Sequence, residues 1–386
     1  MSLAGNPMFA GLPGIEIASL RAQVYRCPVD TPVMTSFGVM HDRPMMLVRA
    51  EDRDGTIGWG ESWCNFPSVG AEHRARIVNR LLATLVERRR FADPPEAFDA
   101  LTTATAVVAL QSGEAGPFAQ CIAGLDIALW DLVARRAGRP LWRMLGGAGP
   151  AIPVYASGIN PDAPERVAAA CRDEGYRDFK LKIGFGPARD AANLTALRRE
   201  LGDAAGLMAD VNQGWSLEEA LRAVPSLERF GLRWLEEPLR ADRLWPEWLA
   251  VAQASGIPLA AGENVAGADG FAAAIASGAL AVVQPDVGKW GGISGTLPVA
   301  RRIIGAGLGY CPHWLGGGIG LLASAHLLAA AGGTGALEVD ANPNPLRTLT
   351  CGPLARVTDG HAALLDDPGL GPVPDEAALR PYRVPD

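Results

Sequence analysis

Three features are scarce in this 386-residue sequence, and each excludes a class of protein. The six cysteines are scattered without a CxxC pair, which excludes a disulfide framework and leads us to expect reduced thiols in the cytoplasm. Lysine and arginine form no block and the net charge is -7, so we expect no nucleic-acid or membrane partner. No uninterrupted apolar run reaches the roughly 18 residues of a spanning helix. Residues 1–13 lack the basic region of a signal peptide and predict a flexible leader.

The composition is otherwise that of an ordinary globular protein, with 48% apolar and 20% charged residues. This length suits one large unit and one smaller unit. Residues 14–145 predict the smaller unit, an antiparallel sheet followed by helices. A hairpin signal stands at Asp54-Gly55, and residues 28–44 and 62–70 are expected to be loops.

Residues 146–350 repeat a strand and a helix at steps of roughly 22 to 29 residues. Such alternation predicts a parallel α/β sheet, and eight strands predict a closed barrel. The sequence of residues 351–386 leaves this rhythm and is expected to pack back on the first unit. The expected strands begin near Ile152, Asp178, Leu207, Leu232, Pro258, Ala281, Leu308 and Ala336.

Three carboxylates follow three successive strands of this repeat, in the motifs ADVNQGW, WLEEPL and LAAGEN. They are Asp210, Glu236 and Glu263. In a barrel of this type the active site lies at the carboxyl ends of the strands, so these side chains should meet there. Hard oxygen donors without nearby cysteine or histidine favour Mg²⁺, with Mn²⁺ as a substitute.

Two lysines, Lys180 and Lys182, are spaced two apart on the strand before the carboxylates, so both point to one face. Phe179, Leu181 and Ile183 occupy the other face and should pack on helices. Two ammonium groups held together disfavour each other's protonation, so one lysine is expected to be a neutral base near neutral pH.

Asp286 and His313 end two adjacent later strands. An aspartate on the neighbouring strand end can orient the imidazole and raise its basicity, so the two residues predict an Asp–His pair. Glu338 ends the last strand and completes the set of ionisable strand ends.

With these positions in place, the chain resembles the enolase superfamily and, within it, the mandelate racemase subgroup. The resemblance covers nearly the whole chain and rests on GWGE, residues 123–147, KLKIG, DVNQGW, EEP, GEN, QPDVGKWGG and the closing PGLGPVPDEAALRPYRV. It implies an α+β capping domain over a modified (β/α)₇β barrel, completed by the C-terminal segment. It also implies removal of the α-proton of a carboxylate bound to Mg²⁺.

The resemblance assigns a role to each of these strand-end residues. Asp210, Glu236 and Glu263 would bind the metal. Lys182 would be the base on one face of the substrate, with Lys180 neutralising the substrate carboxylate. His313, held by Asp286, would act as base or acid on the other face. Glu338 would hydrogen-bond the substrate carboxylate, and Asn212 matches a substrate-contacting position.

The residue at position 286 separates the subgroups. Muconate-lactonizing relatives, including succinylbenzoate synthases and dipeptide epimerases, carry a lysine base where this chain has Asp286. Most relatives with the present set resemble acid-sugar dehydratases, so elimination of water from a small 2-hydroxy or sugar acid is expected first. Racemisation or epimerisation and cycloisomerisation by the same two bases remain alternatives, as does a barrel that binds metal and ligand without turnover.

The substrate is expected to be selected by the two loops, residues 28–44 and 62–70. Their aromatic side chains and methionines indicate a partly apolar pocket. His41, Trp63 and Asn65 are the candidate substrate contacts in these loops. We also expect a homo-oligomer.

Overall fold

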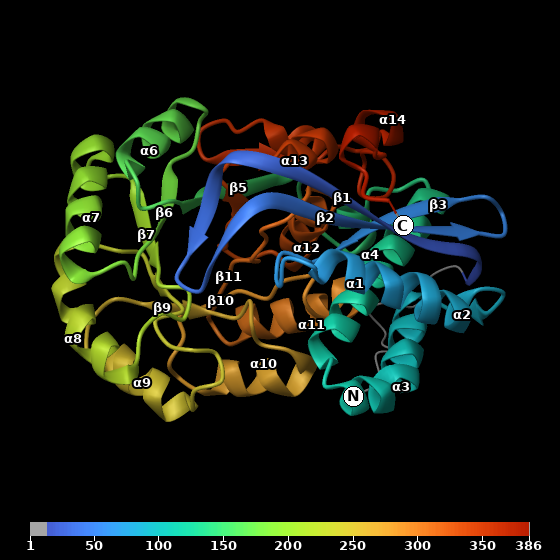
Figure 1. Ribbon diagram of the computed structural model, residues 1–386, viewed down its shortest axis with the longest axis horizontal. Helices are drawn as coiled ribbons and strands as arrows, with labels where there is room; N and C mark the ends of the chain where they lie inside the picture. Colours follow the sequence, from blue (N-terminus) through green and yellow to red (C-terminus); the bar gives the residue numbers. More distant parts are fainter. Residues whose placement is uncertain (1–13, 386) are drawn as a thin grey trace.

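The computed structural model describes residues 14–385, so the leader predicted at residues 1–13 lies outside the described residues. Figure 1 shows a curled sheet surrounded by helices, with an antiparallel sheet and its own helices packed against one side. The described chain therefore has the expected class, a barrel of strands and helices with an α+β capping unit.

The capping sheet has the strand order β3-β2-β1-β4. Its strands are β1 (Ile15–Thr35), β2 (Gly38–Asp52), β3 (Ile57–Ser62) and β4 (Arg90–Phe91). The loop predicted at residues 28–44 is wrong, because β1 and β2 continue through this region as one long hairpin that turns at residues 36–37. A register shift after Pro28 lets the hairpin pass the prolines. Figure 1 shows its tip reaching over the barrel towards β7 and β9.

The capping helices pack on one face of this sheet. They are α1 (Gly70–Ile77), the π-helical turn η2 (Val78–Leu82), α2 (Ala83–Val86), α3 (Pro94–Ser112), α4 (Ala115–Arg136) and α5 (Leu141–Met144). Helix α4 is long and apolar enough to cross a membrane, but 89% of its apolar window is buried inside the protein. It is the central core helix of the capping unit, between the sheet and the barrel helix α11 (Gly292–Gly305).

Strand β3 lies unusually close to α4, and two glycines permit this approach. A Cβ atom on Gly58 would lie 2.0 Å from the carbonyl oxygen of Ala128, and one on Gly60 would lie 2.0 Å from that of Gly124. Both neighbours are backbone atoms of a buried helix, which cannot give way without moving the whole helix. The glycines of the GWGE motif thus set the spacing between sheet and helix.

We expect Gly60→Ala to lower the free energy of unfolding by about 3 kcal/mol, because the new methyl group overpacks the contact with α4. The measurement is urea-induced unfolding followed by fluorescence. Gly116→Ala in α4 is the matched control, since its Cβ would meet nothing closer than 4.0 Å. A Gly60→Ala protein as stable as the control would show that β3 and α4 are not so tightly packed.

The barrel strands run parallel in the order β11-β10-β9-β8-β7-β6-β5-β12. They are β5 (Ala151–Ile159), β6 (Asp178–Lys182), β7 (Gly206–Asp210), β8 (Leu235–Glu236), β9 (Leu259–Ala261), β10 (Val282–Val283), β11 (Gly309–Tyr310) and β12 (Leu337–Asp340). The helices between them are α6 (Pro164–Asp173), α7 (Pro187–Leu201), α8 (Leu217–Leu227), α9 (Trp245–Gln253), α10 (Gly267–Ala276), α11 and α12 (Gly318–Ala331). Each expected strand is present.

The curled sheet ends at β11 and β12, which approach each other without a strand ladder. Instead, the backbone N–H of Ala336 donates to the Cys311 thiol at 3.4 Å, and that of Trp314 donates to Glu338 at 3.2 Å. Helix α12 leads into β12, and the short helix α13 (Pro345–Thr350) follows this strand in place of a full barrel helix. Within residues 14–385 the arrangement is therefore seven strand–helix units and a final strand.

The C-terminal segment contacts both units. Strand β13 (His361–Ala363) pairs antiparallel with β5 of the barrel. Farther along, the backbone N–H of Leu370 donates to Asp131 of α4 at 2.6 Å, and that of Val384 donates to Val24 of β1 at 2.9 Å. The segment also contains the short turns η4 (Gly352–Ala355), α14 (Glu376–Leu379) and η5 (Arg380–Tyr382).

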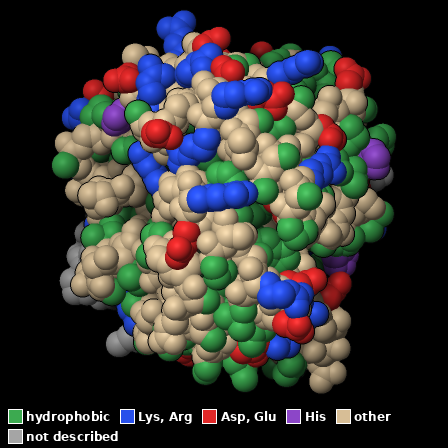
Figure 2. Space-filling model, turned by 90° about the vertical axis from the view of Figure 1, so that its left-hand side faces the viewer, with side chains coloured by type: hydrophobic (Ala, Val, Ile, Leu, Met, Phe, Trp, Pro, Cys, Tyr) green, Lys and Arg blue, Asp and Glu red, His purple; other side chains and the backbone are tan. Residues whose placement is uncertain are grey.

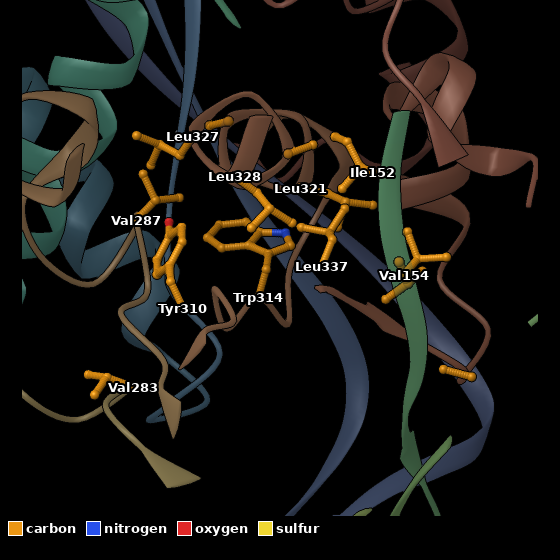
Figure 3. Close-up of a cluster of buried hydrophobic side chains, with 14 of the residues drawn as sticks. Ile152, Val154, Val283, Val287, Tyr310, Trp314, Leu321, Leu327, Leu328 and Leu337 are labelled. Carbon is orange, nitrogen blue, oxygen red and sulfur yellow. The ribbon is translucent and has the colours of Figure 1, made fainter. Parts of the chain in front are cut away.

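The main core lies between the barrel strands and their helices. Phe179, Leu181 and Ile183 belong to it, as expected for the outward face of β6. Figure 3 shows part of this core, where Trp314 lies among Leu321, Leu328 and Leu337. The surface, unlike this core, carries many charged side chains. Figure 2 shows basic and acidic side chains interspersed on the face that carries the left-hand helices of Figure 1.

Candidate active site

The predicted metal ligands meet at the carboxyl ends of neighbouring strands. Asp210 ends β7 and pairs in register with Glu236, the last residue of β8. Glu263 follows β9 by two residues. Asp210 and Glu236 are each only 1% exposed. Burial is the largest influence on Glu236 and, with the charges of Asp210 and Glu338, raises its pKa to about 7 despite the opposing charge of Lys180.

Lys180 lies at the centre of the buried acids. Its ammonium nitrogen is 2.5 Å from Glu236 Oε1, 2.7 Å from Glu338 Oε1 and 4.0 Å from Asp210 Oδ2. Burial opposes its charge, but the surrounding carboxylates outweigh burial and raise the pKa of Lys180 well above its ordinary value. Lys180 is therefore a fixed positive charge in the barrel interior.

The sequence predicted a lowered pKa, and hence a neutral amine, for one of the two lysines, but the pKa of Lys182 is raised like that of Lys180. The Lys182 ammonium nitrogen donates to Asp210 Oδ2 at 2.7 Å. Burial and the charge of Lys180 lower its pKa, as expected, but the Asp210 carboxylate more than compensates and raises the pKa overall. The sequence pattern showed the two lysines side by side but not the acid between them.

Asp286 and His313 form the expected pair at the opposite side of the site. His313 Nδ1 is 2.6 Å from Asp286 Oδ2, and His313 Nε2 is 2.6 Å from Glu263 Oε2. Burial lowers the pKa of His313, but Glu263, Glu338 and Asp286 raise it well above its usual range. The imidazole thus lies between the carboxylate that orients it and the cavity.

The carboxylate oxygens of Asp210, Glu236 and Glu263 suit a divalent cation. These side chains must rotate before all three can reach one cation. Asp210 and Glu236 are held by the lysines, while Glu263 pairs with His313 and with Lys289 at 3.0 Å. Among residues 14–385, no three acidic, histidine or cysteine side chains are already gathered around one point. Three buried carboxylates on adjacent strand ends nevertheless offer the hard oxygen ligands that Mg²⁺ prefers.

A cavity of about 190 Å³ opens above these groups. Lys182 and His313 both line it, so the two predicted bases face one space. Trp63, Asn65 and Asn212, three of the predicted substrate contacts, line it as well. The remaining lining residues are Thr35, Phe37, Phe66, Gln213, Glu263, Asn264, Lys289 and Leu315.

Both capping segments reach this cavity. Phe37 at the hairpin tip packs edge-on against Phe66, with ring centroids 5.1 Å apart, and Ser36 Oγ donates to the Asn212 carbonyl at 2.6 Å.

Two of the predicted contacts, Lys180 and Glu338, are buried and do not line this cavity. The third exception is His41. It lies on β2 with an exposed side chain and does not line the cavity. Residues 38–40 pair with residues 33–35 in the hairpin ladder, and His41 follows at the register shift, where it is carried past the cavity.

Three further polar residues belong to the site and were not predicted. Gln284 donates to Glu236 at 2.7 Å, and Ser157 donates to Glu338. Lys289 lies 4.6 Å from the centre of the Trp63 ring. The sequence contained a usable signal for Gln284, which precedes Pro285-Asp286 on a strand end. Lys289 lies in a loop, three residues after Asp286. The direction of a side chain in a loop cannot be predicted from the periodicity of strands or helices.

Comparison with known families gives two matches that together span most of the chain. Residues 162–378 match the family described as enolase C-terminal domain-like. Residues 19–146 match the mandelate racemase/muconate lactonizing enzyme N-terminal domain. The boundary between the two matches lies near the point where α5 leads into β5.

The relatives include both cycloisomerases and dehydratases. The 3,6-anhydro-α-L-galactonate cycloisomerase of Streptomyces coelicolor is 31% identical over 93% of this chain and 97% of the relative. The arabinonate dehydratase of Saccharolobus solfataricus is 27% identical over 89% of this chain and 91% of the relative. Sugar-acid enzymes of two reaction types thus share nearly the whole length of this chain.

Two solved structures share the fold closely. The mandelate racemase/muconate lactonizing enzyme from Bordetella bronchiseptica RB50 is 57% identical, with a TM-score of 0.91 and coverage of 96% of this chain and 99% of that one. An enolase from Bradyrhizobium, complexed with magnesium and mandelic acid, is 30% identical with a TM-score of 0.84, covering 97% of this chain and all of that one. Magnesium and a small carboxylate are thus found together in a protein of this fold.

Proposed function

This chain belongs to the mandelate racemase/muconate lactonizing enzyme family of the enolase superfamily, and from that premise we propose that it is a sugar-acid dehydratase. One observation carries the proposal: Lys182 and His313 line the same cavity from different strands, and Asp286 orients the histidine. A base and an acid that face one space can remove a proton from one carbon and assist a leaving group on the next.

The proposed metal ligands are Asp210, Glu236 and Glu263, with Mg²⁺ as the cation. When bound, the cation supplies the positive charge that an α-carboxylate needs to accept a second negative charge. Lys180 contributes a fixed positive charge near the same carboxylate.

Glu338 accepts from Lys180, Ser157 and the Trp314 N–H. Burial raises the pKa of Glu338, but Lys180 and His313 lower it overall, so Glu338 must gain a proton before it can donate a hydrogen bond to the substrate carboxylate.

The proposed reaction removes one proton from the substrate on the Lys182 face and delivers a different proton on the His313 face, and exchange with solvent restores both groups after turnover. Lys182 takes the proton from C2, and the electrons of the broken C–H bond move into the carboxylate. The enediolate then expels the hydroxyl group of C3, to which His313 donates a proton, so that water leaves. Ketonisation of the resulting enol gives a 2-keto-3-deoxy acid. For Lys182 to act first it must release its proton, which requires that Asp210 no longer be its partner.

The cavity lining supports a substrate with a single carboxylate. One of its two lysines is Lys182, which must be a neutral amine to act as the base. The other, Lys289, contacts the Asn264 side chain at 3.1 Å and lies 4.6 Å from the centre of the Trp63 ring. No other lysine or arginine of the described chain lines this cavity. A second carboxylate at the far end of the substrate would therefore find at most one cationic partner, and its desolvation is costly. The amide side chains and aromatic rings suit hydroxyl groups and C–H faces instead.

A screen of sugar monoacids and diacids with Mg²⁺, including mandelate-like acids, tests this function. We expect a five- or six-carbon monoacid to be converted to a 2-keto-3-deoxy acid, with kcat/KM at least about tenfold above any diacid. Racemisation of a mandelate-like acid as the best activity would favour the alternative isomerase. A diacid as the best substrate would contradict the inference that the cavity accepts a single substrate carboxylate.

The setting of the enzyme is also a proposal. The six cysteines are all buried and unpaired, which suits the reducing cytoplasm. We further propose that the chain forms a homo-oligomer, which sedimentation analysis of the purified protein would test.

A further inference from the structure

The segment of residues 61–65 at the end of β3 joins the capping unit to two barrel loops. The first loop, residues 286–291, begins with the aspartate of the Asp–His pair. The second, residues 313–317, begins with the histidine. The backbone N–H of Trp63 donates to the carbonyl of Gly288 in the first loop at 3.2 Å. The segment thus contacts the first loop through its backbone.

Its contacts with the second loop come from side chains. Glu61 Oε1 accepts the backbone N–H of Gly317 at 2.5 Å, and Glu61 Oε2 accepts that of Gly320 at 2.9 Å. The Asn65 side-chain amide donates to the carbonyl of Leu315. Glu61 therefore caps the N-terminus of α12 from another unit of the protein, and Asn65 holds the loop that leads into it.

Glu61 is buried and its two oxygens are directed at peptide groups. Burial raises its pKa to about 7, although the N–H groups of Gly320 and Gly317 oppose this. The loop is moulded to the carboxylate: a Cβ atom on Gly317 would lie 2.7 Å from Glu61 Oε1, and one on Gly316 would lie 3.0 Å from it. Burial of a carboxylate costs free energy, so a buried carboxylate at this position indicates a specific role.

The loop that Glu61 holds begins at His313. The next residue, Trp314, lies in the core (Figure 3). Its indole N–H donates to the Gly317 carbonyl at 2.8 Å. Movement of Gly317 would therefore be transmitted to the backbone of His313 through a rigid ring. Lys182 has no such connection, since it lies on β6 and is held by the ladder to β7.

We propose that Glu61 is a positioning residue for His313, holding the Asp286–His313 pair in place from the capping unit while leaving Lys182 unaffected. The proposal goes beyond the dehydratase function and rests on it only for the assignment of the two faces. According to this proposal, the position of His313, the acid, depends on packing of the capping unit against the barrel. The position of Lys182, the base, does not.

The test is Glu61→Gln, which keeps the shape but replaces one acceptor oxygen by an NH₂ group directed at a peptide N–H. The probes are arabinonate and its C2 epimer ribonate in D₂O with Mg²⁺, because each presents its α-proton to a different face. We expect exchange on the His313 face to fall about 10- to 100-fold, as misplacement of a catalytic group does. Exchange on the Lys182 face should change less than about threefold.

Asp126→Asn is the matched control, since Asp126 is another buried carboxylate that caps a barrel helix. Asp126 Oδ2 accepts the backbone N–H groups of Ile293 and Ser294 at 2.7 and 2.9 Å, and Oδ1 accepts the Ser294 hydroxyl at 2.6 Å. Asparagine can keep all three bonds if that hydroxyl turns to accept. We expect the ratio of exchange on the two faces to stay as in the wild type. Equal losses on both faces in Glu61→Gln, or no loss, would overturn the proposal.

A second readout needs no substrate and separates this proposal from the dehydratase function. With ¹⁵N-labelled histidine, the proton between His313 Nδ1 and Asp286 should give a strongly downfield signal, identified by its loss in His313→Asn. We expect Glu61→Gln to shift or lose this signal and Asp126→Asn to retain it. If Glu61→Gln does not fold, Glu61→Asp keeps the charge and withdraws the oxygens, with the same expectation. An unchanged signal in the folded variant contradicts the positioning role, whether or not either acid is turned over.

Discussion

Replacing His313 by asparagine is expected to abolish dehydration, with kcat/KM falling by about 10³-fold, while exchange of the α-proton by Lys182 continues. The loss follows from removing the acid that protonates the leaving hydroxyl group, a contribution worth about 10²- to 10⁴-fold in other enzymes. Asparagine can still accept or donate one hydrogen bond near Asp286, so the pocket should not collapse. The measurement combines product formation with deuterium uptake from D₂O.

His361→Asn is the matched control, because it makes the same chemical change at an exposed position on β13. It should leave both rates unchanged. Lys182→Gln is the mirror experiment and should remove exchange on the opposite face. A fully active His313→Asn enzyme would show that the two-base scheme is wrong.

Removal of Mg²⁺ is expected to silence the enzyme reversibly. With a chelator, kcat/KM should fall by about 10³-fold or more and return when Mg²⁺ is added, because the enediolate has no comparable source of positive charge. Glu236→Gln should weaken Mg²⁺ binding by more than about 100-fold in calorimetry, since it replaces a charged ligand by a neutral one.

The next residue provides the control for the metal site. Glu237 is buried, and burial together with the charges of Glu263 and Asp210 raises its pKa well above the ordinary value. Its oxygens accept from the Asn264 side chain at 2.9 and 3.2 Å, and Glu237 is not one of the proposed ligands. Glu237→Gln makes the same chemical change beside the metal site and should bind Mg²⁺ as the wild type does. If Glu236→Gln bound Mg²⁺ equally well, the proposed ligand set would be incorrect.

Much of the fold followed from the sequence because its signals are periodic. Strand and helix alternate at a regular step, and the structure contains each of the eight expected strands. The same regularity brought Asp210 and Glu236 to neighbouring strand ends, and Asp286 to His313. A residue at the carboxyl end of a parallel strand lies beside the last residues of the neighbouring strands. The members of a site at that end of the barrel can therefore be predicted from the sequence.

The errors occurred where position depends on contacts between the units. Residues 28–44 contain prolines and a glycine and were expected to form a loop, but a long hairpin supported by the barrel is formed instead. That hairpin carries His41 past the cavity. The error at Lys182 lies within the barrel instead: Asp210 pairs in register with Lys182 on the neighbouring strand and raises its pKa, although the sequence prediction weighed only the charge of Lys180 and burial. The partners of Glu61 lie more than 250 residues away in sequence, so no local pattern could indicate them.

The central claim is that the enzyme removes the α-proton of a sugar acid, and proton NMR in D₂O with Mg²⁺ tests it most directly. The best monoacid from the screen should lose its C2 proton signal and yield a 2-keto-3-deoxy acid with one deuterium at C3. Retention of the C2 proton by every acid that calorimetry shows to bind would contradict the account. The barrel would then be one that binds metal and carboxylate without turnover.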